Sequence, residues 1–247
     1  MTNNFYINGN LKYYGIGFTD KAVEALALKQ VEKDVFCGEF NLCEGDVFKL
    51  TRPDWKDTMG FECLRGNRID FVPTDDRYLG KNICCQKDGR YKIKVFAVDA
   101  ITIEYLGEHD ESQPSLWQVA GSLANYDNNW GKGYQKIYLK KLPASLYDTK
   151  YSEDDYNCYY TEKPIFLEKG DELKLAIISY ENWLKDAGAT LIKSRPYGSP
   201  RRETCCVDYG EDVNGHNILI KESGKYRFFI FIKKDDFDDF RIEWSCN

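Results

Sequence analysis

The chain has 247 residues and a formal net charge of −6 at pH 7, from 40 acidic and 34 basic side chains. This balance argues against a nucleic-acid ligand, because a phosphate backbone would be repelled and no dense basic stripe offsets the repulsion. The most apolar run, 228–232, is too short to cross a bilayer, so no membrane insertion is expected.

Nine cysteines are present, so at least one thiol is unpaired, and none belongs to a Cys-x-x-Cys motif. That pattern argues against a zinc ribbon or a redox pair, and we expect no metal and no cofactor. We expect the thiols to act as small core hydrophobes in a reducing compartment. The first ten residues do not form a signal peptide. A cytoplasmic location is therefore expected, with secretion or the cell surface as the alternative if a leader has been removed.

Short strands with a two-residue period are predicted along the first half of the chain. The first is expected at 5–9, others flank the Glu-Gly-Asp turn at 44–46, and one follows the Asp-Gly turn at 88–89. In that last strand, 91–95, apolar residues alternate with lysines, as in a strand with one buried face. The helix-like stretch 21–29 is short, and we expect a loop helix there at most.

The second half of the chain repeats these motifs in the same order. The matching segments are 5–9 with 117–121, 40–50 with 165–175, 80–83 with 215–218, 88–91 with 223–226, and 103–105 with 242–244. Short strands separated by turn signals are typical of antiparallel sandwiches. The sequence therefore predicts an all-β protein of two tandem immunoglobulin-like antiparallel β-sandwich modules.

A polar stretch that ends in proline, 107–114, lies between the last strand of the first copy and the first strand of the second. Exposed polar segments of this kind are usual at domain boundaries. The predicted domains are 1–108 and 114–247.

No pattern of catalytic residues stands out. The chain has two histidines, no His-Glu-x-x-His, no Gly-x-Ser-x-Gly and no glycine loop that would cradle a phosphate. Carboxylates are plentiful and scattered, so any pair of them is uninformative. We expect no enzymatic activity and predict no catalytic residue.

Each half carries a lysine, a tryptophan and an asparagine in that order, namely Lys49, Trp55 and Asn82, then Lys174, Trp183 and Asn217. An indole face stacks on the C–H bonds of a sugar, and nearby polar groups can reach its hydroxyls. Both tryptophans are predicted to lie in polar loops, which favours exposure. The alternative is that they are core residues and that the lysines only cover an outer strand face.

The stretch 119–130, Val-Ala-Gly-Ser-Leu-Ala-Asn-Tyr-Asp-Asn-Asn-Trp, resembles the opening of the glycogen-binding modules of AMP-activated kinase β subunits. The Gly-Lys-Asn-Ile and Gly-x-Tyr-x-Ile motifs are similar to those of tandem cell-surface starch-binding lipoproteins. The resemblance implies two carbohydrate-binding modules that hold a polysaccharide, an α-glucan such as starch or glycogen. Carried over by position, it implies the ligand-binding residues Trp130, Lys174, Trp183 and Asn217 in the second copy, and Lys49, Trp55, Leu79 and Asn82 in the first.

The first copy departs from this pattern because it lacks the first tryptophan, so Tyr14 or Phe18 must substitute. The second copy departs by an insertion, 187–215, that could cover or extend the site. Two other functions stay open on the sequence alone. One is a protein–protein assembly module with no glycan ligand, because a fold does not fix a function. The other is part of an enzyme whose catalytic domain lies outside this chain.

Overall fold

The computed structural model describes residues 4–74, 80–96, 99–110, 112–113, 115–142, 155–179, 182–187, 207–209, 217–234, 236 and 240–246. The chain forms two compact units, Met1–Asp110 (unit 1) and Glu111–Asn247 (unit 2). Across the described ranges, no helix is long and apolar enough to span a membrane.

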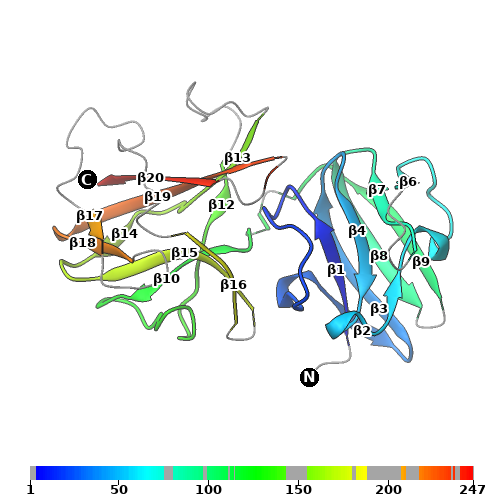
Figure 1. The fold of residues 1–247 in the computed structure, drawn as a ribbon, viewed down its shortest axis with the longest axis horizontal. Coiled ribbons are helices and arrows are strands. Elements are labelled where there is room, and N and C mark those ends of the chain that lie inside the picture. Colours follow the sequence, from blue (N-terminus) through cyan, green and yellow to red (C-terminus); the bar gives the residue numbers. More distant parts are fainter. Residues whose placement is uncertain are drawn as a thin grey trace. The chain divides into compact units, whose positions relative to one another are not determined.

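Unit 1 is built from nine strands and three short 3-10 helices in its described part (Figure 1). The strands are β1 (Phe5–Asn10), β2 (Ala27–Glu32), β3 (Val35–Leu42), β4 (Val47–Thr51), β5 (Thr58–Met59), β6 (Phe71–Pro73), β7 (Ile83–Cys85), β8 (Gly89–Phe96) and β9 (Ala100–Gly107). The 3-10 helices are η1 (Glu24–Leu26), η2 (Pro53–Trp55) and η3 (Phe61–Cys63). The helix-like stretch 21–29 is thus a single 3-10 turn that leads into β2.

The strands of unit 1 follow the order β6-β7-β4-β1-β2-β3-β8-β9, and β5 pairs with β4. Strand β2 joins the two layers: Leu28 near its start pairs with Phe5 of β1, whereas Lys29 pairs with Cys37 of β3. A strand that changes layers in this way makes the corner of a sandwich. All the pairings named here are antiparallel.

The core of unit 1 follows from the two-residue period of its strands. Tyr91, Ile93 and Val95 of β8 are fully buried, and the residues between them are half-buried. Phe48 and Leu50 of β4 face the same core from the other layer, also fully buried. The residues that alternate with them on β4 lie on the outer face of that layer, where the candidate site is found.

Unit 2 has eleven described strands. They are β10 (Trp117–Ser122), β11 (Ile137–Tyr138), β12 (Lys140–Lys141), β13 (Tyr156–Tyr160), β14 (Ile165–Leu167), β15 (Glu172–Ser179), β16 (Asn182–Ala187), β17 (Val207–Tyr209), β18 (Ile218–Ile220), β19 (Gly224–Lys233) and β20 (Phe240–Cys246). One layer has the order β11-β10-β15-β18-β17 with β16 beside β15, and the other has β12-β13-β19-β14 with β20 beside β19. This order matches unit 1 strand by strand, with β11 and β12 in the place of β2, and β13 and β14 in the place of β3.

The two units also share details of packing. Asp46 and Asp171 close the same turn, because each accepts hydrogen bonds from main-chain N–H groups on both carboxylate oxygens. Gly9 and Gly121 sit where a strand passes close to its neighbour, since a Cβ atom there would lie 2.1 and 2.2 Å from a carbonyl oxygen of that neighbour. The all-β sandwich predicted from the sequence is confirmed; the immunoglobulin-like description stays a prediction.

Candidate functional site

The lysine, tryptophan and asparagine predicted in each half lie at equivalent positions on one layer of each unit. Each lysine is on the outer face of its strand, β4 or β15, and each asparagine directly precedes the neighbouring strand, β7 or β18. Thr58 of β5 pairs with Thr51, two positions after the lysine of unit 1, and Asp186 of β16 pairs with Ala176, two positions after the lysine of unit 2. Each tryptophan lies three residues before that partner, Thr58 or Asp186. The residues in question are Lys49, Trp55 and Asn82 in unit 1, and Lys174, Trp183 and Asn217 in unit 2.

In unit 2 the loop that carries Trp130 is fastened to β10 by Asn128, which is fully buried. The Asn128 Oδ1 atom accepts hydrogen bonds from the Gly121 and Gly131 N–H groups, at 2.9 and 3.1 Å. Its Nδ2 donates to the carbonyl oxygens of Val119 and Gln135, at 3.1 and 3.0 Å. The amide therefore uses its full hydrogen-bonding capacity to fix this loop.

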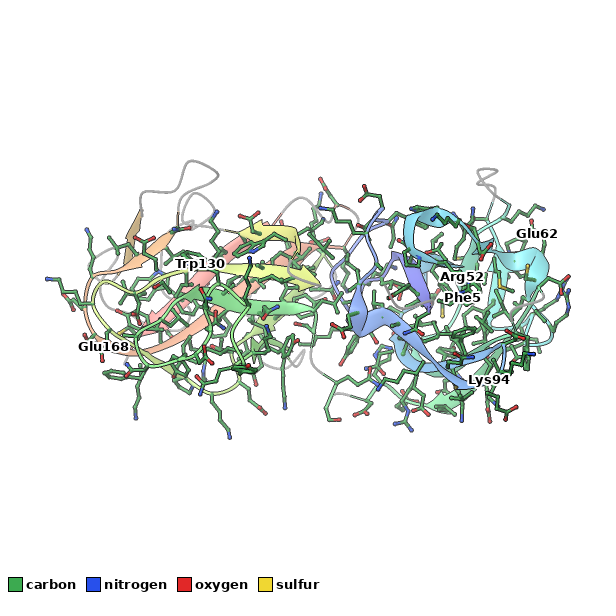
Figure 2. All side chains as sticks on the ribbon, turned by 90° about the horizontal axis from the view of Figure 1, so that it is seen from below. Phe5, Arg52, Glu62, Lys94, Trp130 and Glu168 are labelled. Atoms are coloured by element: carbon green, nitrogen blue, oxygen red, sulfur yellow. The ribbon has the colours of Figure 1, made fainter. Side chains whose placement is uncertain are left out.

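Trp130, labelled in Figure 2, is half-buried and lies beside Trp183, with ring centroids 6.1 Å apart and ring planes 45° apart. Trp183 is also half-buried, so the pair combines partial packing with partial exposure. The sequence placed Trp183 in a loop, and this is wrong: it is the second residue of β16 and pairs with Ile178. The side chain nevertheless reaches the outer face, because the β15–β16 register directs it there.

The backbone of the site is strained in both units. Trp130 and Trp55 have φ values of 55° and 56°, in the left-handed region that non-glycine residues rarely adopt. Asn129, which precedes Trp130, has a φ of 38°. Such conformations cost on the order of 1–3 kcal/mol each and gather at functional sites, where the surrounding structure enforces them. The strain is therefore a reason, independent of exposure, to regard both tryptophans as functional.

The lysine of unit 2 lies below the surface, with 4% of its area exposed. Its Nζ atom is 3.0 Å from a carboxylate oxygen of Asp186, which is on the strand that carries Trp183. Lys174 is four residues from Ile178, the partner of Trp183, so the two positions are about 13 Å apart along β15. The ion pair thus holds β16 against β15, at a distance from the aromatic pair.

Asn217 is 7% exposed and donates from Nδ2 to the Glu172 carboxylate at 2.7 Å. Its Oδ1 atom, and Oε1 of the buried Gln118 on the same face, are enclosed and accept no hydrogen bond from the described residues. Buried acceptors of this kind require an explanation, because an unmade hydrogen bond is unfavourable. Neither oxygen is open to solvent, so a ligand does not reach them in this conformation.

In unit 1 the aromatic partner of Trp55 is Phe18, with ring centroids 6.3 Å and ring planes 28° apart. Phe18 is 40% exposed. Tyr14, the other substitute that the sequence allowed, is 4% exposed, and its hydroxyl oxygen accepts a hydrogen bond from the Asn41 N–H. Phe18 therefore occupies the role that Trp130 has in unit 2. Leu79, also predicted for this site, lies outside the described residues.

Asparagine side chains also fasten the Phe18 segment. Asn8 donates to the Thr19 carbonyl at 2.6 Å and accepts from the Thr19 N–H at 3.1 Å, and Asn10 accepts from the Phe18 N–H at 3.3 Å. A small pocket, with room for about one water molecule, is lined by residues of this segment and by Trp55. The aromatic pair of unit 1 thus stands next to a hollow lined by β1.

The base of the Trp55 turn is held by Arg52. Its guanidinium lies 4.5 Å from the centre of the Phe5 ring and 5.4 Å from that of Phe36, and its Nε is 3.0 Å from an Asp57 carboxylate oxygen (Figure 2 labels Arg52 and Phe5). Cation–π contacts of this kind contribute roughly 0.5–2 kcal/mol each. Arg52 and Asp57, at the two ends of the turn, therefore hold it in place.

Lys49 and Asn82 are buried, with 2% and 4% of their areas exposed. Glu62 lies close enough to Lys49 for their charges to interact. Its partial burial alone would raise the carboxyl pKa, but hydrogen bonds from main-chain N–H groups, including Lys81 N, and the charges of Lys81 and Lys49 hold that pKa below its ordinary value. Glu62 is thus held as a carboxylate near the lysine.

Several residues that build the site were not predicted from the sequence, among them Asn128, Asn8, Arg52, Glu62 and Asp186. Asn128 lies inside the 119–130 motif, but its role depends on four main-chain partners that come together only in the fold. Asp186 acts through an ion pair across strands with Lys174 of β15, and Asn8 through hydrogen bonds to Thr19 in the loop after β1. The only signal in the sequence was the motif around Trp130.

No family model matches the chain, and no curated protein matches it. Among solved structures, the crystal structure of SusF from Bacteroides thetaiotaomicron is similar, at 16% sequence identity and a TM-score of 0.34. The match covers 99% of this chain and 49% of SusF, so the chain spans about half the length of that protein. A likeness of this size says nothing about what the chain binds.

Proposed function

We propose that this chain is a non-catalytic carbohydrate-binding protein that holds an α-glucan, such as starch or glycogen, on one aromatic pair in each unit. The observation that carries the proposal is the recurrence of a half-exposed ring pair, Trp130 with Trp183 and Phe18 with Trp55, at the same place in both units. The left-handed backbone of Trp130 and Trp55 is a second observation that supports it.

The angle between the rings favours a curved ligand. In unit 2 the two indole planes differ by 45°, which suits the bent chain of an α-1,4-glucan better than the flat ribbon of a β-1,4-glucan; the rings of unit 1 are closer to parallel, at 28°. Stacking and a few hydrogen bonds would give weak binding, since each hydrogen bond contributes about 0.5–1.5 kcal/mol net.

Two units in one chain would raise the strength of binding to a long polymer. Once one unit holds a glucan, the second unit meets the same chain at a high effective concentration. The matching strand orders support the further proposal that the units are two copies of one module. Divergence would then explain why unit 1 uses a phenylalanine where unit 2 has a tryptophan.

A second candidate function is a protein–protein assembly module, favoured by exposed apolar side chains such as Ile69 and Phe166, at 89% and 43% exposure. Gel electrophoresis with soluble glycans in the matrix separates the two. Retardation by glycogen or amylopectin, but not by a cellulose-type or mannan-type polymer, supports glucan binding. Equal mobility in all gels would exclude it and leave the assembly function.

A further inference from the structure

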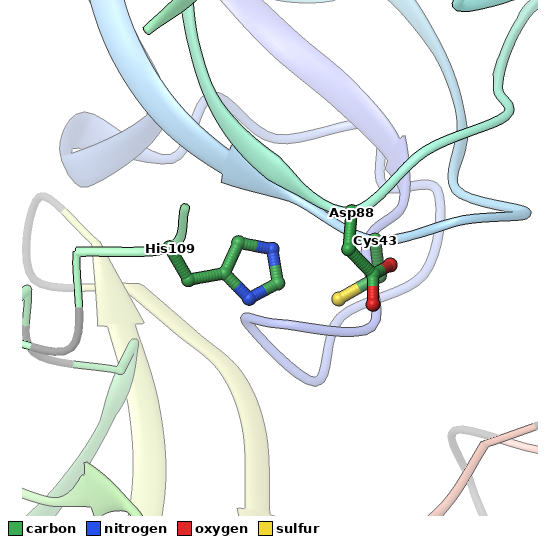
Figure 3. Close-up of side chains that lie close together, drawn as sticks. All are labelled: Cys43, Asp88 and His109. Atoms are coloured by element: carbon green, nitrogen blue, oxygen red, sulfur yellow. The ribbon is translucent and has the colours of Figure 1, made fainter. Parts of the chain in front are cut away.

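Three side chains with metal-binding atoms converge in unit 1, away from the aromatic pair. The Cys43 sulfur, a carboxylate oxygen of Asp88 and a ring nitrogen of His109 all lie within 4.8 Å of one another (Figure 3). Cys43 follows β3, Asp88 precedes β8, and His109 follows β9 by two residues. Cys43 is buried, His109 is half-buried and Asp88 is exposed, so the cluster opens to solvent on one side.

Main-chain groups on either side of Cys43 position the other two side chains. His109 Nε2 lies 2.7 Å from the Leu42 carbonyl oxygen, and Asp88 Oδ1 accepts a hydrogen bond of 2.5 Å from the Glu44 N–H. The His109 ring also meets the edge of the Tyr13 ring, with centroids 5.3 Å apart. Orienting contacts from carbonyl groups and neighbouring rings are usual around metal ligands, because they reduce the freedom that binding would remove.

The segment that carries His109 is fixed as well. The next residue, Asp110, donates its N–H to Asn41 Oδ1 and accepts from Asn41 Nδ2, both at 2.9 Å. Its carbonyl oxygen also accepts from the Tyr13 hydroxyl at 3.2 Å, and its carboxylate is 3.6 Å from the Arg90 guanidinium. The histidine is therefore held in place before any ligand binds, and little rearrangement would be needed.

A cysteine, a histidine and an aspartate can also form a catalytic triad, but this geometry fits one poorly. In a triad the imidazole bridges the nucleophile and the acid. Here a ring nitrogen is engaged by a main-chain carbonyl group, and the carboxylate lies beside the thiol, so the imidazole does not stand between them. A thiolate, a carboxylate and an imidazole nitrogen within 4.8 Å of one another would instead be stabilised by a cation.

We propose that Cys43, Asp88 and His109 bind one Zn²⁺ ion, with water in the fourth position. One sulfur, one nitrogen and one oxygen donor suit a borderline metal such as zinc, whereas Ca²⁺ and Mg²⁺ require mainly oxygen ligands. Bonds of about 2.3 Å to sulfur and 2.0 Å to nitrogen or oxygen place the ligand atoms of a tetrahedral site about 3.5 Å apart. Small side-chain rotations within the 4.8 Å cluster meet that requirement.

The ion would tie the end of unit 1 to the β3–β4 and β7–β8 turns. Because it binds the folded chain, it would stabilise unit 1 in proportion to its concentration. The site shares no residue with the aromatic pairs, so it does not depend on glucan binding.

Titration of the full chain with Co²⁺, a coloured substitute for Zn²⁺, tests the proposal in the presence of a non-thiol reductant. We expect one equivalent to give the thiolate-to-cobalt charge-transfer band and the visible absorption of four-coordinate cobalt, both abolished by excess Zn²⁺. His109→Ala and Asp88→Asn should weaken Co²⁺ binding at least tenfold, and Cys43→Ser should remove the charge-transfer band. Zn²⁺ should raise the Tm of the wild-type chain, and not that of His109→Ala.

The chain offers matched controls for the thiol ligand. Cys37→Ser changes a half-buried thiol of β3 outside the cluster, and a double substitution of Cys205 and Cys206 removes a vicinal pair that could bind cobalt. Both should leave the titration unchanged. The proposal is wrong if no charge-transfer band forms, or if the band and affinity survive in His109→Ala and Asp88→Asn. Both variants change partly exposed positions, so they should remain folded, and circular dichroism would check this.

Discussion

Replacing Trp183 with alanine removes one ring of the unit 2 pair and leaves the core of that unit intact. One face of an indole offers on the order of 80 Å² of apolar surface to a sugar ring, about a third to a half of what a buried tryptophan covers. At about 25 cal/mol per Å², covering that surface contributes about 2 kcal/mol. The Kd of unit 2 for a short α-glucan should therefore rise by a factor of about 30.

Isothermal titration calorimetry with a soluble malto-oligosaccharide measures this change. Two control variants sharpen it: Trp183→Phe keeps a ring and should lose less affinity, and Tyr134→Ala removes an aromatic ring that is 96% exposed and outside the pair. The second control should bind as the wild type does.

The thermal stability of Trp183→Ala is the critical second readout. Trp183 is partly buried, so the loss of its covered apolar surface adds to the roughly 1 kcal/mol of its contact with Trp130; Tm should fall, and unit 2 should remain folded. Complete unfolding of unit 2 would show that Trp183 is a core residue and would refute the assignment of the site. Unchanged affinity in a folded variant would refute it equally.

Three further predictions follow from the contacts around the two sites. Asn128→Ala should abolish glucan binding by unit 2 and lower its Tm, because four hydrogen bonds that fix the Trp130 loop are lost; binding at wild-type strength would contradict this role. Phe18→Ala should weaken glucan binding by unit 1 about as much as Trp55→Ala does, as measured by calorimetry of the full chain. An effect of Trp55→Ala alone would show that Phe18 takes no part in binding. Burial raises the pKa of Asp46 to about 7, so its contribution to the stability of unit 1 is full below about pH 4 and falls as the pH rises through 7. Asp46→Asn should remove that slope from a plot of Tm against pH, and an unchanged slope would exclude Asp46 as its source.

Much of the fold was predictable because strand periodicity and turn chemistry are local. The alternation in 91–95 predicted one buried face, and Tyr91, Ile93 and Val95 are fully buried. The Gly-Asp turns predicted strand boundaries near residues 46 and 171, because turn chemistry is also local, and β4 and β15 begin at the next residue. Trp183 was misplaced because its polar neighbours resemble a loop, whereas pairing with β15 makes the segment a strand.

The candidate site was predictable in its residue types and less so in their roles. The order of lysine, tryptophan and asparagine predicted residues that share one layer of each unit, but the burial of Lys49 and Lys174 has no local signal in the sequence. Tyr14 is buried in the core of unit 1 and Phe18 is exposed, and the sequence does not indicate which of the two rings is buried. The cluster of Cys43, Asp88 and His109 has no local signal, because its members are far apart in the sequence.

The most direct test of glucan binding is the mobility of the full chain in native gels that contain amylopectin. The wild-type chain should be retarded in proportion to the polymer concentration, and a variant with both Trp55→Ala and Trp183→Ala should migrate as in a gel without polymer. Equal mobility of the wild-type chain with and without amylopectin would contradict the account, as would equal retardation of the wild type and the double variant.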